Sequence, residues 1–211
     1  ELFESLLQER VAAGEGPDLA VIPQPGLLQK LARSGAVKPA AAEVTEQAAA
    51  NYSQDWIDFG SVDGAYYAPP LGVNIKSLVW YSPRMFAENG CPIPQALDEL
   101  RTLSDTIAAS GTKPWCVGIE SGTATGWPMT DWVEDFMLGL QGVQVYDQWV
   151  SHEIAFNDPR VVETLDAVGS FVKNPDYVNG TFGDVASIAT TAFKDAGLPI
   201  LEGTCALHRQ A

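Results

Sequence analysis

The sequence is poor in basic residues and histidine, and it has no long apolar run. Of its 211 residues, 12 are Lys or Arg and 27 are Asp or Glu, so the net charge is −15. Such an acidic chain repels phosphate backbones and anionic lipids, which argues against a nucleic-acid-binding or membrane-surface protein. No stretch approaches the roughly 18 to 20 apolar residues of a membrane-spanning helix. Two histidines without clustered ligands predict no metal site.

Cysteine is also scarce. Cys91, Cys116 and Cys205 are too few for a disulfide framework, and they lack the CxxC spacing of a zinc site. Because the count is odd, one disulfide plus a free thiol and three free thiols are both open. We expect Cys116 and Cys205 to lie in strands, each shortly before a loop. A bond between them requires their Cα atoms within about 7 Å, and two buried thiols are the equal alternative.

The common phosphate and nucleophile motifs are missing as well. The Gly-rich stretch 118–126 contains no Gly-Lys-Ser/Thr, the chain has no GxGxxG, and Gly118 to Gly122 does not match the G-x-S-x-G elbow. We therefore expect no cofactor.

Apolar residues at helical spacing alternate with short apolar runs of strand length, which predicts an α/β fold with more helices than strands. The predicted helices are residues 1–13, 27–34, 40–59, 83–89, 96–110, 127–140, 143–150, 158–173 and 186–195. The predicted strands are residues 18–22, 65–68, 72–81, 115–119 and 203–207. The third strand, in which Asn74 and Lys76 share one face, has the pattern of a strand that crosses between two lobes, although an edge strand would look the same.

Residues 120–135 hold the densest set of polar and aromatic side chains. Ser121, Thr123 and Thr125 lie in a loop between a predicted strand and a helix that starts at Trp127. Open α/β sheets bind ligands at the carboxyl ends of their strands. Neutral hydroxyls beside an aromatic ring suit a sugar, whose C–H face covers the ring while its hydroxyls meet the polar groups. An ordinary loop with a core tryptophan is an equal alternative.

Two further groups could carry chemistry. Asp131, Glu134 and Asp135 are candidate glycosidase carboxylates, which need two acids that face each other across the sugar. Asp131 and Glu134 share one helix face, however, and acids on one face usually form a solvated surface. His208 and Arg209, followed by Gln210, end the last predicted strand and predict a site edge. A polar strand end in solvent explains them equally well.

The order of motifs resembles the extracellular solute-binding proteins of sugar ABC transporters, family 1, in the maltose-binding-protein-like group and closest to its α-glucoside and oligosaccharide members. The segment 114–135 is the most specific match, and Ala96 departs from the usual Thr or Trp at a helix start. The other matching segments are residues 16–23 with 27–37, 66–86, 90–100 and 205–211.

The resemblance implies a periplasmic-binding-protein type II-like, two-lobed α/β fold. Residues 1–75 would be part of the first lobe and residues 76–211 part of the second, with a crossing strand near residues 70–81. Family members are longer, so we expect the chain to be a fragment truncated at both ends. The family is secreted or lipid-anchored, which favours a Cys116–Cys205 disulfide.

The resemblance also implies a function and a site. The function is a monomeric, non-enzymatic receptor, periplasmic or extracellular and lipid-anchored in some members, that captures an α-glucoside or other oligosaccharide between its lobes and delivers it to the permease of an ABC importer. Trp127, or else Trp115 or Trp132, would stack on the sugar. The sugar-contacting residues would be Gln24, Asn74, Lys76, Ser121, Thr123, Thr125, Trp127, Asp131, His208 and Arg209. The alternatives are a carbohydrate-active hydrolase using Asp131 and Glu134, and a sensor or adhesin on the same fold.

Overall fold

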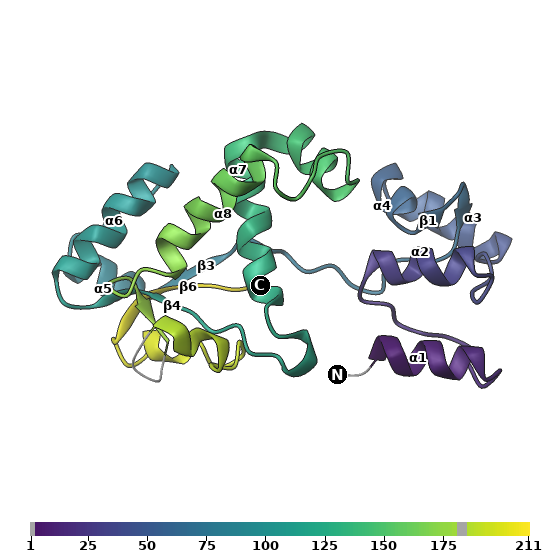
Figure 1. The fold of residues 1–211 in the computed structure, drawn as a ribbon, viewed down its shortest axis with the longest axis horizontal. Coiled ribbons are helices and arrows are strands. Elements are labelled where there is room, and N and C mark those ends of the chain that lie inside the picture. The colour runs from purple at the N-terminus through teal and green to yellow at the C-terminus, as the bar shows by residue number, and fades with distance from the viewer. Residues whose placement is uncertain (1–2, 181–184) are drawn as a thin grey trace. The chain divides into compact units, whose positions relative to one another are not determined.

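The computed structural model describes residues 3–180 and 185–211, and the chain divides into two compact units, Glu1–Asn74 and Ile75–Ala211. Figure 1 labels the elements of both units.

The described part of the first unit consists of helices around a short hairpin. Its elements are α1 (Phe3–Ala12), α2 (Pro25–Arg33), α3 (Ala42–Asn51), α4 (Gln54–Phe59), β1 (Ser61–Val62) and β2 (Ala65–Tyr66). Helix α2 buries two adjacent stripes of residues. Leu27 and Leu31 pack against Leu7 of α1, whereas Leu28 packs against Val62 of the hairpin. The spacing of four residues between Leu27 and Leu31 explains why they share one helix face.

Two predictions for the first unit are wrong and one is confirmed. Residues 18–22 form no strand, because no strand of the described residues lies beside them; Leu19 is 92% exposed. The single helix predicted over residues 40–59 is two helices, since Tyr52 is extended (φ −117°, ψ 152°) and ends α3. The turn at Asp63 and Gly64 is confirmed, and both residues have the positive φ of a tight hairpin turn.

The second unit is built on a four-stranded sheet of order β3-β6-β4-β5. Its strands are β3 (Val79–Tyr81), β4 (Lys113–Cys116), β5 (Val178–Asn179) and β6 (Cys205–Arg209). Strand β4 runs parallel to both β6 and β5, and β3 runs antiparallel to β6. Its helices are α5 (Pro83–Glu88), α6 (Leu97–Ala109), α7 (Trp127–Val150) and α8 (Pro159–Val172), with 3-10 turns η1 (Gly122–Ala124), η2 (Val185–Ala189) and η3 (Leu198–Ile200).

Trp115 of β4 is at the centre of the second unit's core, where it is 1% exposed. Its ring meets Trp132 of α7 at 5.0 Å and Phe171 of α8 at 6.2 Å, both edge to face. Its indole N–H donates to the hydroxyl of Ser104 on α6 at 3.1 Å. One strand residue therefore joins three helices to the sheet. Helix α7 bends at Gly142 (φ 80°), where the sequence predicted a break.

Two predictions for the second unit are wrong. Only Val79–Tyr81 of the stretch 72–81 is a strand, because its partner β6 pairs only up to Arg209, opposite Val79. The helix predicted over residues 186–195 is limited to the 3-10 turn η2. The chain beyond η2 bonds the end of β4 instead, since Glu120 and Ala192 form a parallel bridge.

A disulfide joins Cys116 of β4 to Cys205 of β6, with their Cα atoms 5.7 Å apart, and Cys91 is a free thiol. Among the residues that the structure describes, no helix is long and apolar enough to cross a membrane.

Candidate functional site

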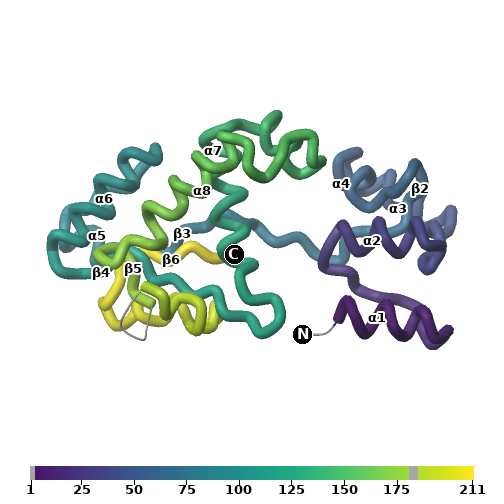
Figure 2. Tube along the Cα trace, viewed as in Figure 1, coloured from purple at the N-terminus to yellow at the C-terminus, as the bar shows by residue number. Residues whose placement is uncertain are grey.

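Three segments converge at one edge of the second unit's sheet. Strands β4 and β6 are parallel, so their carboxyl ends meet at the same edge, and β3 is antiparallel, so it starts there (Figure 2). This topology brings together the residues before β3, the loop after β4 and the end of β6. Helix α7 begins after the β4 loop, and its residues Asp131 and Asp135 contact the other two segments.

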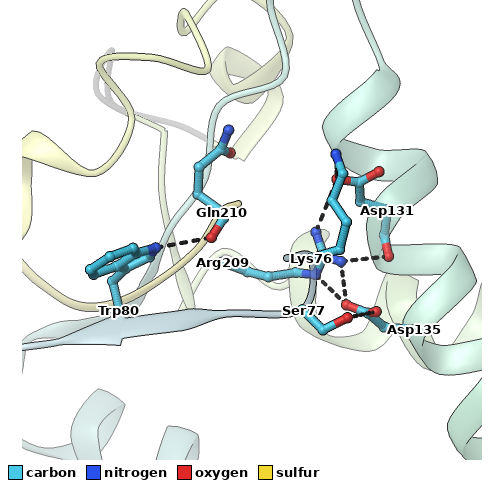
Figure 3. Close-up of polar contacts among 7 residues, drawn as sticks. All are labelled: Lys76, Ser77, Trp80, Asp131, Asp135, Arg209 and Gln210. Carbon is cyan, nitrogen blue, oxygen red and sulfur yellow. Dashed lines mark hydrogen bonds and ion pairs between the residues drawn. The ribbon is translucent and has the colours of Figure 1, made fainter. Parts of the chain in front are cut away.

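Arg209, at the end of β6, anchors the site to α7. Its side chain is 5% exposed and forms an ion pair with Asp135, to which its Nε donates at 2.5 Å. Its Nη2 also donates to the backbone carbonyl of Asp131 at 2.8 Å, and its Nη1 lies 3.6 Å from the Asp131 carboxylate (Figure 3). A buried guanidinium is tolerated only where it is paired and hydrogen-bonded. Asp131 and Asp135 supply these partners to Arg209.

Lys76 and Ser77 approach the same acids from the exposed segment before β3. Lys76 Nζ donates to Asp131 Oδ2 at 3.0 Å, and the Ser77 hydroxyl donates to Asp135 (Figure 3). Ser77 has a left-handed φ of 66°, which an L residue adopts only at a cost. Its hydrogen bond to Asp135 holds the bend at which the chain enters β3.

The loop after β4 is ordered by its own side chains. The Thr125 hydroxyl accepts from the Ser121 N–H at 3.0 Å and donates to the Gly122 carbonyl at 2.7 Å. The Glu120 carboxylate accepts from the Gly122 N–H at 2.6 Å. Thr125 therefore shapes the loop, and the exposed Thr123 lies at its tip.

Trp127, the first residue of α7, contacts a cation and a second aromatic ring. Lys76 Nζ lies 4.8 Å from its ring centroid, and Phe193 meets it edge to face at 4.9 Å. Phe193 is placed by the backbone, since its N–H donates to the Glu120 carbonyl at 3.1 Å. Gly118 lets this segment come close, because a Cβ there would lie 2.7 Å from Thr191.

Glu134 of α7 has a raised pKa. Burial raises the pKa of Glu134, and the nearby carboxylates of Asp131 and Asp135 raise it further, against the opposing effect of Lys76 and Arg209. The site is thus an acidic helix face, in which three carboxylates lie near the two cations Lys76 and Arg209.

The structure brings four of the predicted sugar-contacting residues together, namely Lys76, Trp127, Asp131 and Arg209. It separates His208 from them, although His208 is next to Arg209 in the sequence. Successive strand residues point to opposite faces. His208 Nδ1 therefore lies 2.9 Å from the carbonyl oxygen of Cys116 on β4, and its ring packs against Gly197. Since a carbonyl only accepts, Nδ1 carries the proton, and burial lowers the pKa of the imidazole.

Gln24 and Asn74 belong to the first unit. Gln24 directly precedes α2 and is exposed, and Asn74 is the exposed last residue of that unit. They are not part of the group described above.

Two of the tryptophans considered as sugar platforms are core residues. Trp115 is 1% exposed and Trp132 is 4% exposed, so the expectation that either stacks on a sugar is wrong. The predicted sugar-contacting residues do not include Ser77, Asp135 or Phe193. The spacing of four between Trp127, Asp131 and Asp135 could have revealed Asp135, because such residues share a helix face. No local pattern marks Phe193, which a bridge distant in sequence brings into place.

Comparisons with known proteins identify the family. The model of the family described as "Bacterial extracellular solute-binding protein" matches residues 5–206. The alpha-glucosides-binding periplasmic protein AglE of Rhizobium meliloti is 41% identical over all of this chain and 47% of its own length. The osmoprotective compounds-binding protein GgtB of Synechocystis is 43% identical over all of this chain and 50% of its own length. The chain thus spans about half the length of these relatives.

Solved structures agree in fold. A chitin oligosaccharide binding protein aligns with a TM-score of 0.75 at 16% identity, over 99% of this chain and 49% of its own. A sugar transporter from Arthrobacter chlorophenolicus with bound laminaribiose aligns with a TM-score of 0.72 at 16% identity, over 99% and 50%. The predicted fold class, α/β of the periplasmic-binding-protein type II kind, is confirmed. The chain therefore belongs to the bacterial extracellular solute-binding protein family.

Proposed function

We propose that this chain is part of a carbohydrate-binding receptor of an ABC importer, which captures an α-glucoside or another oligosaccharide and delivers it to the membrane permease. The observation that carries the proposal is the juxtaposition of Trp127 with the Asp131 carboxylate in a chain of this family. An aromatic ring beside acceptor oxygens matches the apolar face and the hydroxyls of a sugar. The names of AglE and of several structural neighbours point to the same ligand class.

The two units correspond, in this proposal, to parts of two lobes, with residues 1–75 in the first and 76–211 in the second. Trp127, Asp131 and the loop from Ser121 to Thr125 supply the sugar contacts of the second lobe. Gln24 and Asn74 supply contacts from the first-lobe side. His208 acts indirectly, because its buried ring supports the end of β4 that carries the loop.

The receptor acts in the periplasm or outside the cell, either free or held by a lipid anchor, and works as a monomer. The Cys116–Cys205 disulfide supports an oxidising compartment of this kind, because disulfides persist there and are rare in the cytosol.

The receptor catalyses no reaction. A glycosidase needs two acids that face each other across the sugar, whereas Asp131 and Glu134 lie three residues apart on one helix face, and the Asp131 carboxylate contacts Lys76 and Arg209. The raised pKa of Glu134 is the one feature that favours the rival hydrolase. Burial and the two neighbouring carboxylates on the same helix explain this raised pKa without a catalytic role.

Calorimetric titration of the complete protein with maltose, trehalose, sucrose and longer oligosaccharides tests the proposal. We expect saturable binding of at least one sugar and no release of reducing sugar over hours. Heat from an amino acid or a metal ion but from no sugar would contradict the receptor. Sugar cleavage that is lost in Asp131→Asn or Glu134→Gln would favour the hydrolase.

A further inference from the structure

Lys76 contacts the Trp127 ring and the Asp131 carboxylate, the two groups that a bound sugar would use. Its ammonium lies 4.8 Å from the centroid of the Trp127 ring and 3.0 Å from Asp131 Oδ2. A pyranose that stacks on Trp127 and hydrogen-bonds Asp131 would meet the same ring and the same oxygen. The Lys76 side chain thus occupies the position that part of the sugar would take.

Lys76 is also the contact in this group that is most easily withdrawn. Its side chain is 47% exposed, whereas that of Asp131 is 14% exposed. It reaches the site from a segment in which residues 71–80 are all exposed. A lysine on an exposed segment can exchange its ion pair for water at little cost, because exposed pairs are weak and screened by salt.

The rest of the site does not depend on Lys76. Without it, Asp131 still has Arg209, which contacts both its carboxylate and its backbone carbonyl. Trp127 still has Phe193 against its ring. Withdrawal of the lysine would therefore leave an open ring and a positioned carboxylate.

We propose that Lys76 is a specificity-determining residue that occupies the Trp127–Asp131 site in the ligand-free protein and leaves the ring when a sugar binds. This inference rests on the proposed function. Its consequence is that Lys76 opposes the binding of neutral sugars. It also disfavours cationic sugars, because Lys76 would repel a second positive charge beside Trp127. Without Lys76, the ring and the acids would attract that charge.

The test compares Lys76→Ala, which uncovers the ring, with Lys76→Arg, which keeps a cation there. Lys113→Met is the matched control, since Lys113 lies at the start of β4, the end of the strand opposite the loop, where it bonds the Pro175 carbonyl. The probes are whichever of maltose, trehalose and sucrose the wild-type protein binds most tightly, and the 2-amino-2-deoxy derivative of that sugar. Thermal unfolding of each variant shows that it is folded, as expected for an exposed position.

We expect Lys76→Ala to bind the neutral sugar about three- to tenfold more tightly than wild type, the size of one exposed ion pair plus one cation–π contact. The gain should be larger for the amino sugar, and Lys76→Arg and Lys113→Met should show neither. Wild-type affinity for the neutral sugar should also rise between 20 mM and 500 mM NaCl, and this rise should vanish in Lys76→Ala.

The outcomes separate the inference from the proposed function. If the wild-type protein binds a sugar and Lys76→Ala binds it equally or more weakly, Lys76 is an ordinary ligand contact or a bystander and the inference is overturned, while the receptor function stands. If no sugar binds to the wild-type protein or to Lys76→Ala, the proposed function fails and the inference fails with it.

Discussion

Two cations from different regions of the molecule contact the same carboxylate, that of Asp131. Arg209 ends a central strand, is 5% exposed and is also paired with Asp135. Lys76 lies in an exposed segment, is 47% exposed and has no second acid among its contacts in the structure's described residues. The comparison teaches that equal charge gives unequal roles, because burial makes a pair costly to break and exposure makes it easy to exchange.

Removal of Arg209 should give the largest effect. Arg209→Met leaves Asp135 and Asp131 without their buried partner, so we expect a loss of about 3 to 5 kcal/mol of unfolding free energy. Lys76→Met, the matched change on the exposed side, should lose under about 1 kcal/mol. Urea unfolding followed by near-ultraviolet circular dichroism, which reports the packed tryptophans, measures both. Equal losses of unfolding free energy in the two variants would contradict the unequal roles of Arg209 and Lys76.

The Cys116–Cys205 disulfide should have the next largest effect, because it ties the two strands from which the loop and Arg209 extend. Its cysteines are 89 residues apart, and a disulfide, which restricts the unfolded chain, typically contributes about 2 to 4 kcal/mol of stability. The double variant Cys116→Ala, Cys205→Ala should therefore unfold at a lower urea concentration than wild type. Cys91→Ala is the control and should not show this loss. A double variant as stable as wild type would mean that the strands hold their register without the bond.

Glu134→Gln should have the smallest effect, with a sign that depends on pH. The folded state raises the pKa of Glu134, so its ionisation costs stability above the folded pKa and costs nothing below the ordinary value near 4.5. The variant should be more stable than wild type at pH 7, by less than about 1 kcal/mol, and the difference should vanish near pH 4. Thermal unfolding at the two pH values measures it. A variant less stable at pH 7 would show that the carboxylate makes a favourable contact.

Much of the second unit could be predicted from the sequence, because its signals are local. The helix start at Asp158, whose carboxylate accepts from the Arg160 N–H, and the break at Gly142 both follow from single residues. The Trp127 to Asp135 segment was identified because a loop rich in hydroxyls precedes a helix there. Local patterns such as these need no knowledge of the partner strand.

The failures share a cause, which is dependence on a distant partner. Residues 72–78 alternate like a strand, but β6 pairs only with Val79 to Tyr81. Ala192 and Phe193 carry a helical pattern, but they bond Glu120 at the end of β4. The opposite fates of His208 and Arg209 likewise depend on which face of the sheet is covered by α7. None of these contacts is encoded within a window of ten residues.

The central claim is that Trp127 forms the sugar platform of the second lobe. Trp149, which lies in the second half of the same helix and also packs edge to face on an aromatic ring, provides the matched control. Calorimetry of the complete protein should show that Trp127→Ala weakens sugar binding about tenfold or more, while Trp149→Ala leaves it within about twofold. Equal affinities of wild type and Trp127→Ala for every sugar that binds would contradict the account.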